Sequence, residues 1–136
     1  MPPIPYRVPL VVAPVDIDRQ GHVNNVTFVR YVQDAAVAHW SARAPAEAQE
    51  GFTWVIRRHE VEYLKPVVLG DEIEARTWVG DPSAATWERF TEIVRQGDGA
   101  LVAKARTVWV LLDSASGRPR RVDPNWVRWL HPDEIP

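Results

Sequence analysis

The chain has 136 residues, of which 46% are hydrophobic and 25% are charged, a composition typical of a globular domain and not of a disordered or fibrous chain. Its formal net charge of −2 gives no general attraction to nucleic acid or anionic lipid, since both favour basic surfaces. There is no cysteine, which excludes disulfides, thiolate catalysis and cysteine-ligated metals.

Strand-like residues open the chain and lead through a polar loop into a helix. The run 6–12 is rich in β-branched residues and contains Pro9, which favours an edge strand. Residues 16–25 are polar and predict a loop. From Val26 to about Ser41 there is neither proline nor glycine, and apolar residues recur at helical spacing around most of the circumference. This pattern predicts a helix that is covered on most sides.

Four strand-like runs follow, each bounded by turn residues: 52–64, 72–79, 86–95 and 101–112. In the second run, apolar and charged residues alternate, as expected when one face of a sheet is buried and the other is wet. No helical pattern separates these runs, so antiparallel pairing is expected. Segment 44–51 is a connection without a predicted element, and Asp123 with Pro124 predicts the start of a short helix. One domain over residues 1–136 accounts for these elements.

Polar side chains concentrate just before the helix, in the segment 16–25, Asp-Ile-Asp-Arg-Gln-Gly-His-Val-Asn-Asn. The N-terminus of a helix offers unpaired N–H groups that can stabilise the oxyanion developing on a carbonyl group. A carboxylate nearby would complete a hydrolytic site. Taken singly, Asp16, Asp18, Asn24 and Asn25 are more often turn and capping residues than catalysts.

Residues 16–31 resemble the helix-entry motif of hotdog-fold thioesterases, specifically the 4-hydroxybenzoyl-CoA thioesterase-like group and the related plant acyl-ACP thioesterases. In that motif, Asp-x-Asp, His-Val-Asn-Asn and an aromatic helix face recur. Further matches lie at 62–66, 69–72 and 109–113, so the resemblance covers about residues 8–122. It implies an α+β hotdog fold, in which a curved antiparallel β-sheet wraps around one long central α-helix.

The resemblance implies hydrolysis of an acyl thioester of coenzyme A or acyl carrier protein to a free acid and a thiol. Asp18 matches the family's catalytic aspartate, which acts as nucleophile or as general base. The oxyanion donor matches the backbone N–H of Asn25, with Asn24 as a close alternative. His22 matches a histidine that assists catalysis in the acyl-ACP branch, whereas Gln20 replaces that branch's asparagine. Gln20 and Asn24 are expected to orient the substrate, and Asp16 is expected to be structural.

No cofactor or metal is expected, because an oriented carboxylate and preorganised donors suffice for an activated acyl group. Coenzyme A or the acyl carrier protein enters only as part of the substrate. The family also implies a homodimer or homotetramer. Two alternatives stay open: a hotdog acyl-thioester hydratase or dehydratase, and a non-catalytic acyl-carrier binding protein. With three prolines among the first six residues and no apolar stretch of about 20 residues, we expect a cytoplasmic protein.

Other polar and aromatic residues are expected to be structural. His39 lies on the apolar helix face and is expected to be buried with its hydrogen bonds satisfied. The strand tryptophans are expected to pack in the core or at an interface: Trp54, Trp78, Trp87 and Trp109. Three arginines near the C-terminus indicate a solvated turn, with binding of carrier phosphates as the alternative: Arg118, Arg120 and Arg121.

Overall fold

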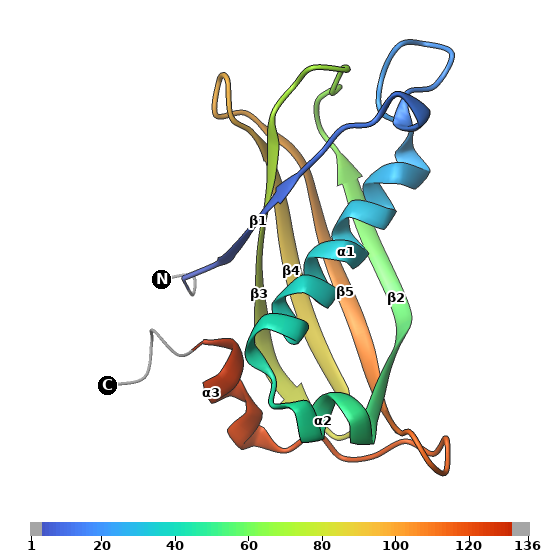
Figure 1. The fold of residues 1–136 in the computed structure, drawn as a ribbon, viewed down its shortest axis with the longest axis vertical. Helices are drawn as coiled ribbons and strands as arrows, with labels where there is room; N and C mark the ends of the chain where they lie inside the picture. The colour runs from blue at the N-terminus through green and yellow to red at the C-terminus, as the bar shows by residue number, and fades with distance from the viewer. Residues whose placement is uncertain (1–3, 132–136) are drawn as a thin grey trace.

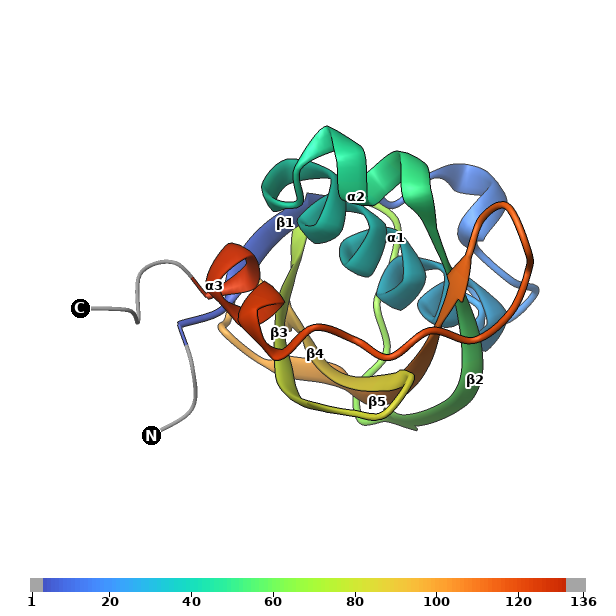
Figure 2. The same ribbon diagram turned by 90° about the horizontal axis from the view of Figure 1, so that it is seen from below.

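In a computed structural model of the protein, which describes residues 4–131, one curved sheet encloses one long helix (Figures 1 and 2). The sheet has five antiparallel strands in the order β1-β3-β4-β5-β2. Their bounds are Tyr6–Leu10 for β1, Phe52–Tyr63 for β2, Ile73–Ser83 for β3, Thr86–Arg95 for β4 and Leu101–Asp113 for β5. The predicted strand set and its antiparallel pairing are confirmed.

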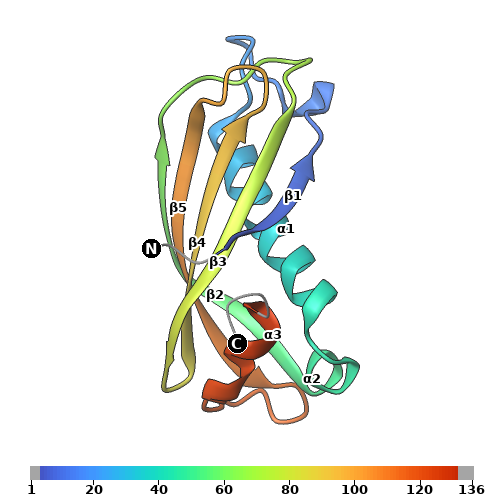
Figure 3. The same cartoon turned by 90° about the vertical axis from the view of Figure 1, so that its left-hand side faces the viewer.

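Strand β1 lies at the edge of the sheet beside β3 (Figure 3). Pro9 is therefore tolerated, because an edge strand has only one neighbour to which its residues must donate. β1 ends at Leu10, two residues earlier than predicted. β3 runs past the predicted end at Val79 to Ser83, because a register shift lets its last residues keep pairing with the start of β4. The alternation predicted for this run holds from Ile73 to Val79, where every second residue is buried.

Helix α1, Asn25–Arg43, crosses the concave face of the sheet (Figure 2). It ends where Ala44 turns extended, with ψ of 142°, as proline at the next position requires. Pro45 is also the N-cap of a second helix, α2 (Ala46–Gly51). The sequence interpretation assigned no element to segment 44–51 and so missed this helix, because a short helix with a single buried residue, Ala48, shows no periodicity.

The C-terminal part of the described chain packs against the lower end of α1 (Figure 3). A 3-10 turn, Pro124–Trp126, leads into helix α3, Val127–Leu130. Asp123 caps this turn by accepting a hydrogen bond from the N–H of Asn125 over 2.9 Å. The predicted helix start at Asp123 and Pro124 is thus confirmed.

Two apolar clusters fill the space between α1 and the sheet. The upper one surrounds the first half of α1 and includes Phe28, Val32, Val67, Ile73, Ile93 and Val102. The lower one surrounds its second half and includes Val79, Trp87, Leu111, Val122, Trp126 and Leu130. Between the two clusters, the sheet positions that face the helix carry buried polar residues: Thr77, Arg89, Thr91 and Thr107.

His39 joins α1 to this polar layer. Its Nδ1 accepts a hydrogen bond from the guanidinium of Arg89 over 2.9 Å, and its Nε2 lies 3.0 Å from the carbonyl oxygen of Leu130. Because Arg89 can only donate, the ring proton resides on Nε2. The prediction of a buried histidine with satisfied hydrogen bonds is confirmed.

Candidate active site

The segment between β1 and α1 folds back on itself as a tight turn, at the upper end of the molecule in Figure 1. Ile17 and Val23 form an antiparallel bridge, and next to it the N–H of Asp18 donates to the carbonyl oxygen of His22 over 2.8 Å. Gly21 has a φ of +84°, a left-handed conformation that glycine adopts without strain. The turn therefore places Asp18 opposite His22.

The Asp18 carboxylate is anchored through one of its two oxygens. Oδ1 accepts hydrogen bonds from the N–H groups of Gln20, over 2.9 Å, and His22, over 3.4 Å. Oδ2 has no hydrogen-bond donor among residues 4–131, and the residue is only partly buried. One oxygen thus fixes the side chain while the other is free to contact a substrate.

The N-terminus of α1 has one free backbone donor. Asn24 is the N-cap: its Oδ1 accepts from the N–H of Val26 over 2.8 Å, and its own N–H donates to the carbonyl oxygen of Asp16 over 2.9 Å. The N–H of Asn25, the first residue of α1, has no acceptor among the described residues. Of the two positions named for an oxyanion donor, Asn25 has the unoccupied N–H and Asn24 does not.

The turn brings Asp18 close to this helix terminus. Asp18 faces His22 across the bridge, and Asn24 follows His22 by two residues, a separation of about 7 Å at the rise of a strand. The side chains of His22 and Gln20 make no hydrogen bond to the rest of the described chain; His22 is partly buried and Gln20 is exposed. The structure therefore gathers the candidate residues in one turn.

Asp16 has a different environment, with 1% of its surface exposed. Its carboxylate accepts hydrogen bonds from the Ala13 N–H over 2.9 Å, the Tyr31 hydroxyl over 2.8 Å and Arg30 over 3.0 Å. Burial by itself raises the pKa of Asp16, but these three donors and the Arg30 charge outweigh it and leave the pKa below its usual value. Asp16 thus ties the turn to α1, as expected of a structural residue.

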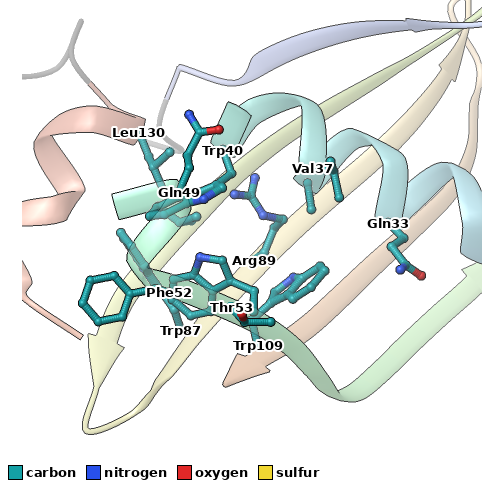
Figure 4. Close-up of a pocket in the computed structure, with 13 residues that line it drawn as sticks. Gln33, Val37, Trp40, Gln49, Phe52, Thr53, Trp87, Arg89, Trp109 and Leu130 are labelled. Carbon is teal, nitrogen blue, oxygen red and sulfur yellow. The ribbon is translucent and has the colours of Figure 1, made fainter. Parts of the chain in front are cut away.

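The sequence interpretation missed a cavity of about 330 Å³ beside the second half of α1 (Figure 4). Three of the strand tryptophans that were expected to pack in the core or at an interface line it: Trp54, Trp87 and Trp109. The fourth, Trp78, stacks on Phe90 instead, with ring centroids 5.9 Å apart. Alternation on β4 and β5 places such side chains on the inner face, but it does not reveal that space remains between them.

A curved antiparallel sheet around one long helix is the hotdog fold, and solved structures of this class match most of the chain. A 1,4-dihydroxy-2-naphthoyl-CoA thioesterase from Synechocystis superposes with a TM-score of 0.83 at 17% identity, covering 97% of this chain and 99% of that chain. A thioesterase from Thermus thermophilus, solved with coenzyme A and zinc, gives 0.79 at 29% identity, covering 91% and 95%. The predicted fold is confirmed.

The sequence profile of the Thioesterase-like superfamily matches residues 12–130, and the chain belongs to that family. A chloroplastic acyl-[acyl-carrier-protein] hydrolase of Cuphea viscosissima is 22% identical over 123 residues. That alignment covers 84% of this chain and 29% of the plant protein, so the chain spans less than a third of the relative's length. Within residues 4–131, no helix is both long enough and apolar enough to cross a bilayer.

Proposed function

We propose that the protein is an acyl thioesterase, which hydrolyses a thioester carried by coenzyme A or acyl carrier protein. The observation that carries the proposal is the pairing of two free groups in one turn. Asp18 presents an unoccupied carboxylate oxygen, and the same turn leads into α1, whose first residue, Asn25, has an unoccupied N–H. Membership of the Thioesterase-like superfamily supports this assignment.

In this reaction the thioester carbonyl oxygen accepts a hydrogen bond from the Asn25 N–H, where the positive end of the helix stabilises negative charge. Oδ2 of Asp18 then either attacks the carbonyl carbon, forming an acyl anhydride that water hydrolyses, or takes a proton from an attacking water molecule. In both routes the carbon–sulfur bond breaks and the thiolate leaves and takes up a proton. His22 and Gln20, on the same turn, orient the substrate.

Coenzyme A is the carrier that needs fewer assumptions, because the CoA branch of the family requires only the aspartate and the helix terminus. The acyl-ACP branch also uses an asparagine, which Gln20 replaces here, and an acidic residue on a later strand that has no match in this sequence. We also propose a cytoplasmic homodimer or homotetramer that needs no metal or cofactor. β2 is a suitable pairing surface: it is an edge strand of 12 residues, and the open main-chain groups of such an edge are a template for a second copy. Light scattering of the purified chain measures the assembly directly.

The test is thiol release from aromatic, short-chain and long-chain acyl-CoAs by the wild type and Asp18→Asn. The amide keeps the shape of the side chain but cannot attack or accept a proton, so we expect a loss of about a hundredfold or more in kcat. Asp123→Asn is the matched control, because Asp123 also accepts from the N–H two residues ahead, over 2.9 Å, in an exposed turn. It should retain full activity.

Undiminished turnover by Asp18→Asn would remove Asp18 from the mechanism. The same assay separates the proposed function from the two alternatives, because neither of them releases thiol. A hydratase or dehydratase would change the acyl chain without releasing thiol, and a non-catalytic binding protein would bind acyl-CoA and leave it intact.

A further inference from the structure

The cavity beside the second half of α1 has the walls of a ligand-binding pocket. It lies between α1, the start of β2, β4, β5 and α3, with a volume of about 330 Å³, within the range of pockets that hold small organic molecules. Five aromatic side chains line it: Trp40, Phe52, Trp54, Trp87 and Trp109. Aromatic faces at this density suit a planar or extended apolar body.

One wall of this pocket carries a buried cation. Arg89 is 5% exposed, and in Figure 4 its side chain extends from the sheet among the aromatic residues. Its Nη1 donates to His39 Nδ1 over 2.9 Å and to the Thr77 hydroxyl over 3.0 Å. Both partners are neutral, and Arg89 forms no ion pair with any carboxylate of residues 4–131. Nε and Nη2 have no acceptor within that range.

A buried charge without a counter-ion is unfavourable, and proteins normally pair it. Burial lowers the pKa of Arg89 only to about 9, so the guanidinium stays positive at neutral pH. An anionic group in the pocket would compensate this charge. A carboxylate fits best, because its two oxygens match the fork of guanidinium donors.

A second donor in the same wall also has no partner. The indole Nε1 of Trp109 is buried and makes no hydrogen bond to the described residues, although buried donors of this kind are nearly always paired. Trp109 pairs with Trp87 across the strands, and Thr107, two residues earlier, pairs with Arg89. Trp109 and Arg89 are therefore diagonal neighbours on one face of the sheet, roughly 7–8 Å apart.

From these observations we propose that the pocket binds an organic carboxylate with an aromatic or medium-length aliphatic body, with Arg89 and the Trp109 indole as donors to its acidic end. The pocket starts at Gln33 and reaches Trp40, which places it roughly 12 to 22 Å along α1 from Asn25. The carboxylate has two sources: a free acid, or the far end of an acyl group whose thioester lies at Asp18. The second source rests on the function proposed above.

Binding can be measured without turnover, because four tryptophans line the pocket and report occupancy by fluorescence. The probes are 2-naphthoate and decanoate, with 2-naphthamide and decanol as uncharged controls. We expect the wild type to bind each acid at least tenfold more tightly than its control. Equal affinity for acid and control, or no binding of either, would overturn the proposal, and this comparison requires no variant.

Arg89→Met keeps length and apolar volume but removes the charge, and should weaken acid binding by about tenfold to a hundredfold while leaving the uncharged controls unchanged. Trp109→Phe keeps an aromatic ring without the indole donor and provides a milder variant if Arg89→Met fails to fold. It should weaken acid binding only. Acid affinity unchanged in both variants would contradict the assignment of these donors.

Hydrolysis of hexadecanedioyl-CoA and palmitoyl-CoA distinguishes the two sources, since these substrates differ by a carboxylate at the far end of a chain long enough to reach the pocket from Asn25. If Arg89→Met raises KM for hexadecanedioyl-CoA alone, the pocket receives the acyl group of the substrate. If naphthoate binding depends on Arg89 but hydrolysis of both substrates does not, the ligand is a free acid. If the wild type hydrolyses neither, this counts against the proposed function and leaves the binding result intact.

Discussion

Asn25→Pro removes the backbone N–H proposed to bind the thioester oxygen, together with the exposed carboxamide of Asn25. Asn25 is the first residue of α1, the helical position at which proline is best tolerated. Its N–H has no acceptor among the described residues, so no hydrogen bond of the fold is lost. Proline also requires an extended residue before it, and Asn24 already has φ of −63° and ψ of 143°.

From this geometry we expect the unfolding free energy of Asn25→Pro to stay within about 0.5 kcal/mol of the wild type. Loss of one oxyanion donor typically reduces kcat by about a hundredfold to a thousandfold, so the variant should be folded and nearly inactive. Asn25→Ala is the matched control: it deletes the carboxamide, keeps the N–H and should retain activity.

Thiol release from acyl-CoA and urea denaturation, measured on the same preparations, separate the two effects. A fully active Asn25→Pro variant would refute the assignment of this N–H. Equal loss of activity in Asn25→Ala and Asn25→Pro would point to the side chain instead. A large loss of stability in the proline variant would show that the N–H has an acceptor in solution.

Two further predictions concern stability. Burial, together with the Arg89 charge, lowers the pKa of His39 from 6.5 to about 3. Between pH 6.5 and pH 3, His39 is therefore protonated in the unfolded chain and neutral in the folded one. The free energy of unfolding consequently falls on acidification, by up to about 1.4 kcal/mol per pH unit. Urea titrations from pH 8 to 4.5 should show that slope reduced in His39→Gln, and identical slopes would contradict it. Asp16→Asn should lower the free energy of unfolding by roughly 1–3 kcal/mol, because an amide N–H₂ replaces a carboxylate oxygen that accepts from buried donors such as Tyr31. The exposed Asp34→Asn should be near neutral, and equal denaturation midpoints for the two variants would rule out this role for Asp16.

The elements of the fold were predictable because they rest on local patterns. Helix α1 lacks proline and glycine and repeats apolar residues at helical spacing, and β3 alternates buried and wet positions. The end of β3 and the existence of α2 were less predictable. β3 continues past Val79 because β4 offers partners there, and α2 is too short to show a period. Both depend on contacts made after the chain has folded.

The same division applies to the candidate site. Residues 16–25 are dense in polar groups, and the resemblance that they carry implies roles for Asp18 and Asn25. The sequence did not determine that Asn24 uses its own N–H within the turn while the N–H of Asn25 stays free. That distinction depends on how the turn closes against the carbonyl oxygen of Asp16.

The sequence by itself thus determined that a curved antiparallel sheet covers a helix preceded by a polar turn, because hydrophobic periodicity and turn chemistry act over a few residues. Only the tertiary structure decided which of the polar groups remain without partners. Arg89 illustrates the reason: in the sequence it is one charged residue in an alternating strand, on the inner face. Whether a carboxylate reaches it depends on other segments of the chain, and the two that hydrogen-bond to it provide only neutral partners, His39 from α1 and Thr77 from β3.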